Sequence, residues 1–265
     1  MAERPIIFSA SMVRALLEGR KTQTRRLAWR WVKDRNQRHL NDDDADGCHQ
    51  PSPWQRVKPG DLIWVREAVQ ADEDDERFRI VRYLADGFET RIQDTPQAHE
   101  DWLRLYTYRT DDLAAGGKTV PPIHMPRSAS GITLRVTAVR VERLQDISQL
   151  DAIAEGLECL SKDRGRVWKW GLPGRDGLPG ADDGGWPWTM WCIGHKPAFA
   201  SLWDSLHGPD AWAANPEVVV MHFDVLHGNI DWVKALPASS LDAIRAVPRP
   251  EPGALATVEG AARDG

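Results

Sequence analysis

Residues 132–138 (ITLRVTA) alternate strictly between apolar and polar side chains, and this pattern restricts the fold more than any other in the chain. A period of two predicts a β-strand with one buried face. The phase slips by one residue at Val139 and Val141, which indicates a bulge. Shorter segments with strand-like patterns follow the same logic, and we expect further strands at 62–65, 77–84, 102–108 and 218–226.

Helical periodicity is confined to three segments. Apolar residues spaced three and four apart predict amphipathic helices at 9–18, 147–157 and 197–206. Strands and helices do not alternate regularly along the chain, so a parallel βαβ sheet is not indicated. The predicted fold class is α+β, a mostly antiparallel barrel-like sheet with a few flanking helices and long inserted loops.

Composition limits the setting of the protein. Among 265 residues, 42% are hydrophobic and 28% charged, which is typical of a globular protein. No apolar run is long enough to cross a membrane, and the N-terminus lacks the apolar core of a signal peptide. Three cysteines do not form a disulfide framework, so we expect a reduced, cytoplasmic location.

Positive charge is concentrated near the N-terminus, although the net charge is −5. Residues 19–26 (GRKTQTRR) follow the predicted first helix directly, and Gly19 suits the left-handed turn that ends such a helix. A helix end can present reactive side chains on a fixed backbone. The same residues also suit a solvated turn and an edge strand. A local basic patch on an acidic chain favours a small anionic ligand or a short strand over a long duplex.

Three motifs in order resemble one family. They are the turn at 19–26, the segment 59–67 (PGDLIWVRE), and the strand at 132–141 followed by a helix ending in Ala-Ile-Ala-Glu-Gly at 152–156. Together they look like an ASCH domain, a branch of the PUA-like β-barrel superfamily. The chain is most similar to the larger ASCH-type proteins of phage and prophage genomes. The resemblance implies one domain over 1–227, with insertions near 28–58, 71–122 and 161–195. After residue 228 the sequence signals fade, so we expect a partly disordered tail at 228–265, with disorder over 248–265.

The resemblance also implies a cleft for a nucleobase or nucleotide. PUA-like relatives bind RNA, and a small bacterial ASCH protein is an N4-acetylcytidine amidohydrolase. Its active lysine and threonine correspond to Lys21 and Thr24, and its active glutamate corresponds to Glu155. A neutral lysine can take the proton of a threonine hydroxyl, and a glutamate can shuttle that proton to the leaving amine. Because alternate strand residues face opposite sides, Lys21 and Thr24 can meet only across a turn or bulge.

Other residues are candidates for contact with the ligand. Arg20 and Arg26 supply cations beside Lys21, and Arg26 could stabilise an oxyanion or hold a phosphate. Trp64 could stack on a base or belong to the core, and Glu67 is a second candidate carboxylate. Arg127 lies in a loop that the resemblance includes.

Three functions remain open from the sequence. The first is a metal-independent amidohydrolase with a Thr nucleophile, a Lys base and a Glu proton shuttle, which acts on an acylated nucleobase or nucleoside. The second is a non-catalytic module that binds RNA or a modified base, and the third is a phage accessory scaffold. We expect a nucleoside, nucleotide or short RNA as the partner, and no membrane, metal or cofactor; the oligomeric state stays open.

Overall fold

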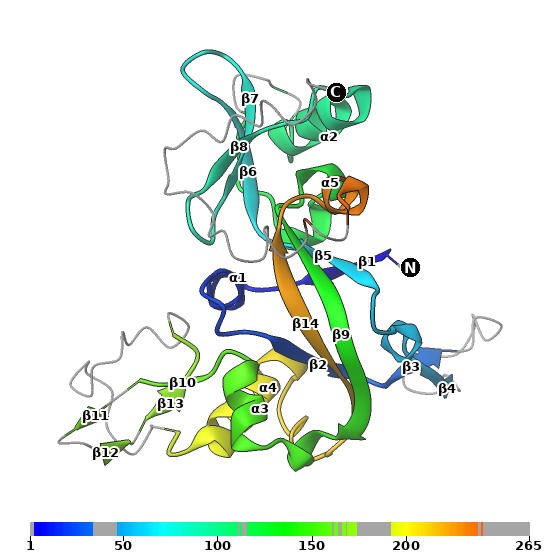
Figure 1. The fold of residues 1–265 in the computed structure, drawn as a ribbon, viewed down its shortest axis with the longest axis vertical. Coiled ribbons are helices and arrows are strands. Elements are labelled where there is room, and N and C mark those ends of the chain that lie inside the picture. The colour runs from blue at the N-terminus through cyan, green and yellow to red at the C-terminus, as the bar shows by residue number, and fades with distance from the viewer. Residues whose placement is uncertain are drawn as a thin grey trace. The chain divides into compact units, whose positions relative to one another are not determined.

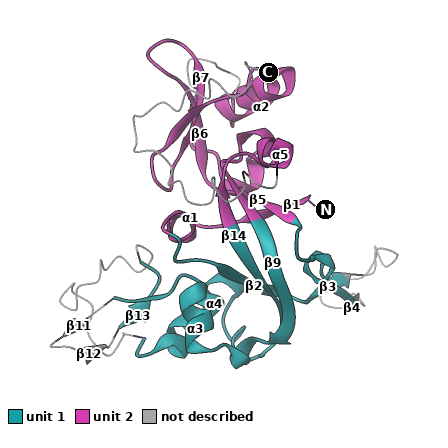
Figure 2. Ribbon diagram, viewed as in Figure 1, with its two compact units in different colours: residues 1–2, 19–61, 135–224 teal, residues 3–18, 62–134, 225–265 magenta. Residues whose placement is uncertain are grey.

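The computed structural model describes residues 3–33, 47–110, 112, 116–160, 162–163, 166–167, 169–173, 192–237 and 240. These residues form two compact units (Figure 2). Unit 1 contains residues 1–2, 19–61 and 135–224, and unit 2 contains residues 3–18, 62–134 and 225–265. The predicted disorder of residues 248–265 lies outside the described residues.

A mixed five-stranded sheet has the strand order β1-β5-β9-β14-β2 (Figure 1). It contains β1 (Glu3–Ile7), β2 (Gln23–Leu27), β5 (Leu62–Arg66), β9 (Ile132–Arg143) and β14 (Glu217–His227). In unit 2, β1 pairs in parallel with β5, and in unit 1, β14 pairs antiparallel with β2. With its helices, the chain is α+β, and the strands predicted at 62–65, 132–141 and 218–226 are confirmed.

Unit 1 carries its helices on the segments that follow β9. The helices α3 (Gln149–Ala154) and α4 (His195–His207) pack against each other. The helix expected at 147–157 is shorter than predicted, and Gly156 at φ +98° follows its end. Short strands accompany these helices: β10 (Glu158–Cys159), β11 (Lys162–Asp163), β12 (Arg166–Val167) and β13 (Trp170–Gly171).

The described residues of 29–54, which are 29–33 and 47–54, do not form the loop that the sequence indicated. Strand β3 (Trp29–Lys33) pairs antiparallel with β4 (Gly47–Pro51), and the short 3-10 helix η1 (Pro53–Arg56) follows. Trp29, Arg30 and Trp31 alternate apolar, polar and apolar, but this run is too short to stand out as a strand pattern in the sequence. This hairpin belongs to unit 1.

Unit 2 contains a second sheet with the order β6-β7-β8. Its strands are β6 (Val69–Glu73), β7 (Arg79–Tyr83) and β8 (Glu89–Arg91), and helix α2 (Pro96–Tyr106) packs against β6. The unit also contains α1 (Ala10–Leu17), η3 (Pro122–His124), η4 (Arg127–Ala129) and α5 (Ile230–Ala235). The helix expected at 9–18 and the strand expected at 77–84 are therefore present.

The strand predicted at 102–108 is wrong, because this segment forms the second half of α2 and its end. Trp102 and Tyr106 have the same strand parity, but they are also four residues apart and stack with ring centroids at 4.7 Å. Trp102 Nε1 donates to the carbonyl of Ile80 at 2.9 Å, which fixes the helix on the sheet. The apolar pattern fits both periods, and packing decides between them.

The N-cap of α2 gives a direct test of this correction. Thr95 accepts a hydrogen bond from the Ala98 N–H at 3.2 Å, and Pro96 takes the first helical position. Thr95→Ala should therefore lower the free energy of unfolding by about 1 kcal/mol. Thr90→Ala, on strand β8 outside the helix, is the control. Equal losses measured by urea denaturation would contradict the capping role.

Candidate functional site

Lys21 and Glu155 meet in the interior of unit 1. The Lys21 side chain is 1% exposed, and its Nζ lies 2.7 Å from Glu155 Oε2. The same Nζ donates to the Glu155 backbone carbonyl at 2.9 Å. Local structure explains the approach: Gly19, at φ +71°, turns the chain after α1, and the Thr22 N–H donates to the carbonyl of Ala154 at the end of α3. Two of the three predicted catalytic residues are therefore in contact.

Arg25 extends this pair into a buried ionic network. Its guanidinium donates to Glu155 Oε1 at 3.1 Å and to Glu142 Oε1 at 2.6 Å, and it lies 3.6 Å from Asp151. Arg140 then contacts both Glu142 and Asp151 at 2.7 Å. Each buried charge thus has an opposite partner, which is the condition under which charges are tolerated in an interior.

Burial shifts the protonation of the network. Desolvation lowers the pKa of Lys21, while the charge of Glu155 opposes that shift and the neighbouring arginines add to it. Burial alone would raise the pKa of Asp151, but hydrogen bonds from Ser148 and Arg140 outweigh it and hold the pKa well below its usual range. The network therefore favours an ionised Asp151 and a lysine that releases its proton more easily than usual.

Thr24 does not join this pair. Lys21 and Arg25 both reach Glu155, so the odd-numbered residues of β2 face the network. Strand alternation then directs Thr24 to the opposite face, where it is buried and opposite Met221 of β14. Among the described residues, no hydrogen bond joins Thr24 to Lys21. β2 pairs regularly with β14 over Gln23–Leu27, and the Phe223 N–H donates to the Thr22 carbonyl at 3.0 Å, so the same register continues to the residue after Lys21 without a bulge.

The predicted ligand residues divide between the two units. In unit 1, Arg20 donates to the carbonyl of Gly156 at 3.1 Å, and Arg26 lies over the Trp54 ring at 5.9 Å. In unit 2, Trp64 belongs to an apolar cluster that includes Leu62, Leu226, Ile230 and Val233.

Glu67 and Arg127 of unit 2 are also committed to local contacts. Glu67 is 1% exposed, and its backbone N–H points to the sulfur of Met125. Arg127 forms ion pairs with Glu3 and Asp231. These contacts give Trp64 and Arg127 structural roles in unit 2, whereas Arg26 lines a pocket.

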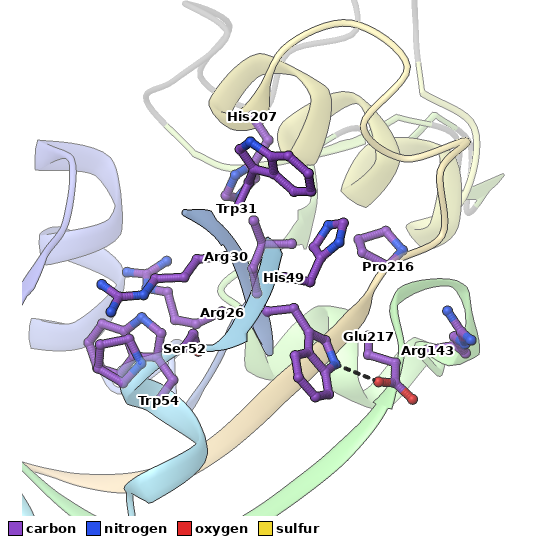
Figure 3. Close-up of a pocket in the computed structure, with 13 residues that line it drawn as sticks. Arg26, Arg30, Trp31, His49, Ser52, Trp54, Arg143, His207, Pro216 and Glu217 are labelled. Atoms are coloured by element: carbon purple, nitrogen blue, oxygen red, sulfur yellow. Dashed lines mark hydrogen bonds between the residues drawn. The ribbon is translucent and has the colours of Figure 1, made fainter. Parts of the chain in front are cut away.

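An open pocket of about 930 Å³ lies in unit 1, on the side of β2 that carries Arg26 (Figure 3). Strands β3 and β4, helix η1, the end of α4 and the start of β14 supply its walls. Its lining combines large aromatic rings and cations, from Arg26, Leu27, Trp29, Arg30, Trp31, His49, Ser52, Pro53, Trp54, Arg143, His207, Pro216 and Glu217.

Positive charge exceeds negative charge in this pocket. Three arginines line it, and the one carboxylate among the lining residues, Glu217, accepts a hydrogen bond from Trp29 Nε1 at 2.8 Å (Figure 3). Burial, followed by the charge of Arg26, lowers the pKa of His207, so this histidine is mainly neutral near pH 7. The pocket therefore suits an anion that does not depend on a charged histidine.

Tryptophan rings provide flat apolar surfaces in the same pocket. Trp31 is 54% exposed and packs edge-on against His49 at 5.1 Å between ring centroids. Trp54 has the Arg26 guanidinium on one face. Tryptophan is enriched at binding interfaces, and its exposed ring face can stack on a nucleobase.

The sequence did not indicate this pocket, because most of its residues lie in the segment interpreted as an insertion, near 28–58. Its usable signal was local: the Trp-Arg-Trp run at 29–31 and the basic residues of the same region. The contributions of Arg143, His207 and Glu217 depend on long-range folding and have no local signature.

Comparisons with known proteins give no relative: no family model matches the chain, and neither curated proteins nor solved structures give a significant match. Within the described part of the chain, no three His, Cys, Asp or Glu side chains are grouped to hold a metal ion. None of the described helices combines the length and apolar character needed to cross a membrane.

Stability should depend on pH through His207 and His222. Burial is the largest cause that lowers the pKa of each ring, and Arg26 and Arg140 respectively add to it. The unfolded chain takes up protons near pH ~6.5, where the folded chain does not, so stability is lost as the pH falls below that value. Urea denaturation between about pH 7 and pH 5 should show this slope, and His207→Gln with His222→Gln should flatten it. An unchanged slope in the double variant would contradict the assignment.

Proposed function

We propose that the protein is a binding module for an anionic ligand that carries a nucleobase. This ligand is a nucleotide or a short single-stranded RNA. The observation that carries this proposal is the pocket of unit 1, where three tryptophans and three arginines line one volume of about 930 Å³. Tryptophan faces stack on bases, and arginines bind phosphate oxygens. The affiliation with ASCH domains of phage type, the PUA-like barrel and the cytoplasmic location belong to the same proposal.

Local charge supports this ligand class over an uncharged aromatic molecule. The chain as a whole has a net charge of −5, yet the pocket gathers Arg26, Arg30 and Arg143. Arg30 is exposed and makes no hydrogen bond or ion pair with the described residues, so a phosphate can reach it without displacing a protein partner. A hydrophobic ligand would leave this charge unused.

Calorimetric titration with a nucleoside monophosphate, its nucleoside and inorganic phosphate tests the proposal. The nucleoside monophosphate should bind more tightly than either part alone, because only it uses rings and arginines together. Trp54→Ala should weaken this binding by about tenfold, the typical value of one stacked base. The control is Trp232→Ala, on α5 of unit 2, whose side chain is also partly exposed. Equal weakening in both variants, or no binding, would contradict the proposal.

A second candidate function is hydrolysis of an acylated nucleoside, and one observation favours it. Lys21 Nζ lies 2.7 Å from Glu155 Oε2, and desolvation lowers the pKa of Lys21 towards a form that can accept a proton. Thr24 has the wrong parity to serve as nucleophile beside Lys21, so this candidate uses water in its place. Hydrolysis of N4-acetylcytidine that Lys21→Met abolishes and Thr24→Val preserves would support it. Absence of turnover in the folded wild-type protein would remove it.

A further inference from the structure

The pocket of unit 1 offers two separate stacking surfaces. Trp54 belongs to η1 and is held by the Arg26 guanidinium, at 5.9 Å from the ring centroid. Trp31 belongs to β3 and is held by the His49 ring of β4. The two labelled rings lie apart in Figure 3: Trp54 lies beside Arg26, and Trp31 lies beside His207. One base cannot stack fully on both.

Cations lie on two sides of the pocket. Arg26 and Arg30 lie near Trp54, and Arg143 lies on the opposite side of the pocket (Figure 3). A mononucleotide carries its phosphate at one end, so it would use only part of this charge. A strand with consecutive phosphates would use cations along the whole pocket, as in the electrostatic grooves that follow a single-stranded backbone.

Few groups in the pocket can read the edges of a base. Apart from the arginines, the polar lining side chains are His49, Ser52, His207 and Glu217, and Glu217 is already engaged by Trp29. Stacking depends on the face of the base and is nearly independent of its identity. The chemistry of the lining therefore favours binding with little base preference.

We infer that the ligand of this pocket is a single strand of nucleic acid with at least two consecutive nucleotides, whose bases stack separately on Trp31 and Trp54. This inference rests on the proposed function, because it assumes that the pocket binds a base and a phosphate. A duplex is excluded as the preferred form, since its paired bases cannot open onto tryptophan faces without unstacking. RNA and DNA share the chemistry that the pocket recognises.

A length series tests the inference. Binding of uridine monophosphate, a uridine dinucleotide, and uridine and thymidine oligomers of about eight nucleotides would be measured by calorimetry, with a duplex of equal length as control. We expect affinity to rise about tenfold from the mononucleotide to the dinucleotide, because a second base is stacked. RNA and DNA oligomers should bind within a few-fold of each other, and the duplex more weakly.

Variants locate the two bases. Trp31→Ala and Trp54→Ala should each weaken dinucleotide binding about tenfold, and their effects should multiply in the double variant. Circular dichroism would show that each variant is folded, and Trp232→Ala controls for loss of an exposed ring elsewhere. Mononucleotide affinity equal to that of the oligomers, or a duplex that binds as tightly, would overturn the inference and leave the proposed function intact. Absence of binding by every ligand would overturn both.

Discussion

Glu155→Ala should lower the free energy of unfolding by about 3–5 kcal/mol, because it leaves two buried cations without their shared partner. Lys21 Nζ and Arg25 Nη1 lie 2.7 and 3.1 Å from the two oxygens of this carboxylate. Both side chains are at most 1% exposed, so bulk solvent does not replace the lost carboxylate. The effect is measurable by urea denaturation followed by circular dichroism.

A matched control comes from the next glutamate along the chain. The Glu158 side chain is 52% exposed and lies 3.8 Å from Arg20. Glu158→Ala should therefore change stability by only about 0–1 kcal/mol, as surface ion pairs do. Lys21→Met should cost less than Glu155→Ala, because Glu155 keeps its contact with Arg25. If Glu155→Ala and Glu158→Ala were equally mild, the network would not be an essential part of the core.

The second large effect concerns ligand binding. Arg30→Glu combined with Arg143→Glu should weaken binding of a single-stranded oligomer by about 100-fold at about 0.1 M salt, because two attractions become repulsions. The dependence of affinity on salt should also become shallower, since fewer counterions are released. Fluorescence anisotropy with a labelled oligomer, repeated over a range of salt concentrations, measures both quantities.

The control for this variant must change the net charge equally. Arg56→Glu with Arg77→Glu does so: both side chains are exposed, and neither lines the pocket. Arg56 lies only two residues from Trp54, so the control changes a charge close to the pocket as well as the net charge of the protein. A similar loss of affinity in both double variants would indicate a general charge effect and would contradict binding at the pocket.

Some of the fold could be predicted because local pattern and packing agree. The alternation of 132–138 and the apolar run at 62–65 are strands, and the helices at 9–18 and 197–206 end near glycines, as expected. The strand predicted at 102–108 failed because Trp102 and Tyr106 satisfy both the strand period and the helix period. The helix start at Thr95 and Pro96 and the packing of α2 on β6 favour the helix.

The candidate site also contains features that could be predicted from the sequence and features that could not. The contact between Lys21 and Glu155 was expected from the resemblance to ASCH domains, and the structure places these residues together. Thr24 was expected beside them, but the regular pairing of β2 with β14 turns it to the other face. The pocket was not expected, because its lining comes from β2, the β3–β4 pair and η1, and also from Arg143, His207 and Glu217, which lie far away in sequence. Such a surface depends on tertiary structure and leaves only a short aromatic run as its local sign.

Photo-crosslinking shows where a ligand lies, so it can test whether single-stranded nucleic acid binds in the pocket of unit 1. A single-stranded oligomer that carries 4-thiouridine would be bound to the wild-type protein, irradiated and mapped by mass spectrometry. We expect adducts on β3, β4 and η1, above all at Trp31 and Trp54. An excess of unlabelled oligomer should abolish these adducts. Adducts confined to residues 62–134 of unit 2, or adducts that persist in the Trp31→Ala/Trp54→Ala variant, would contradict binding in this pocket.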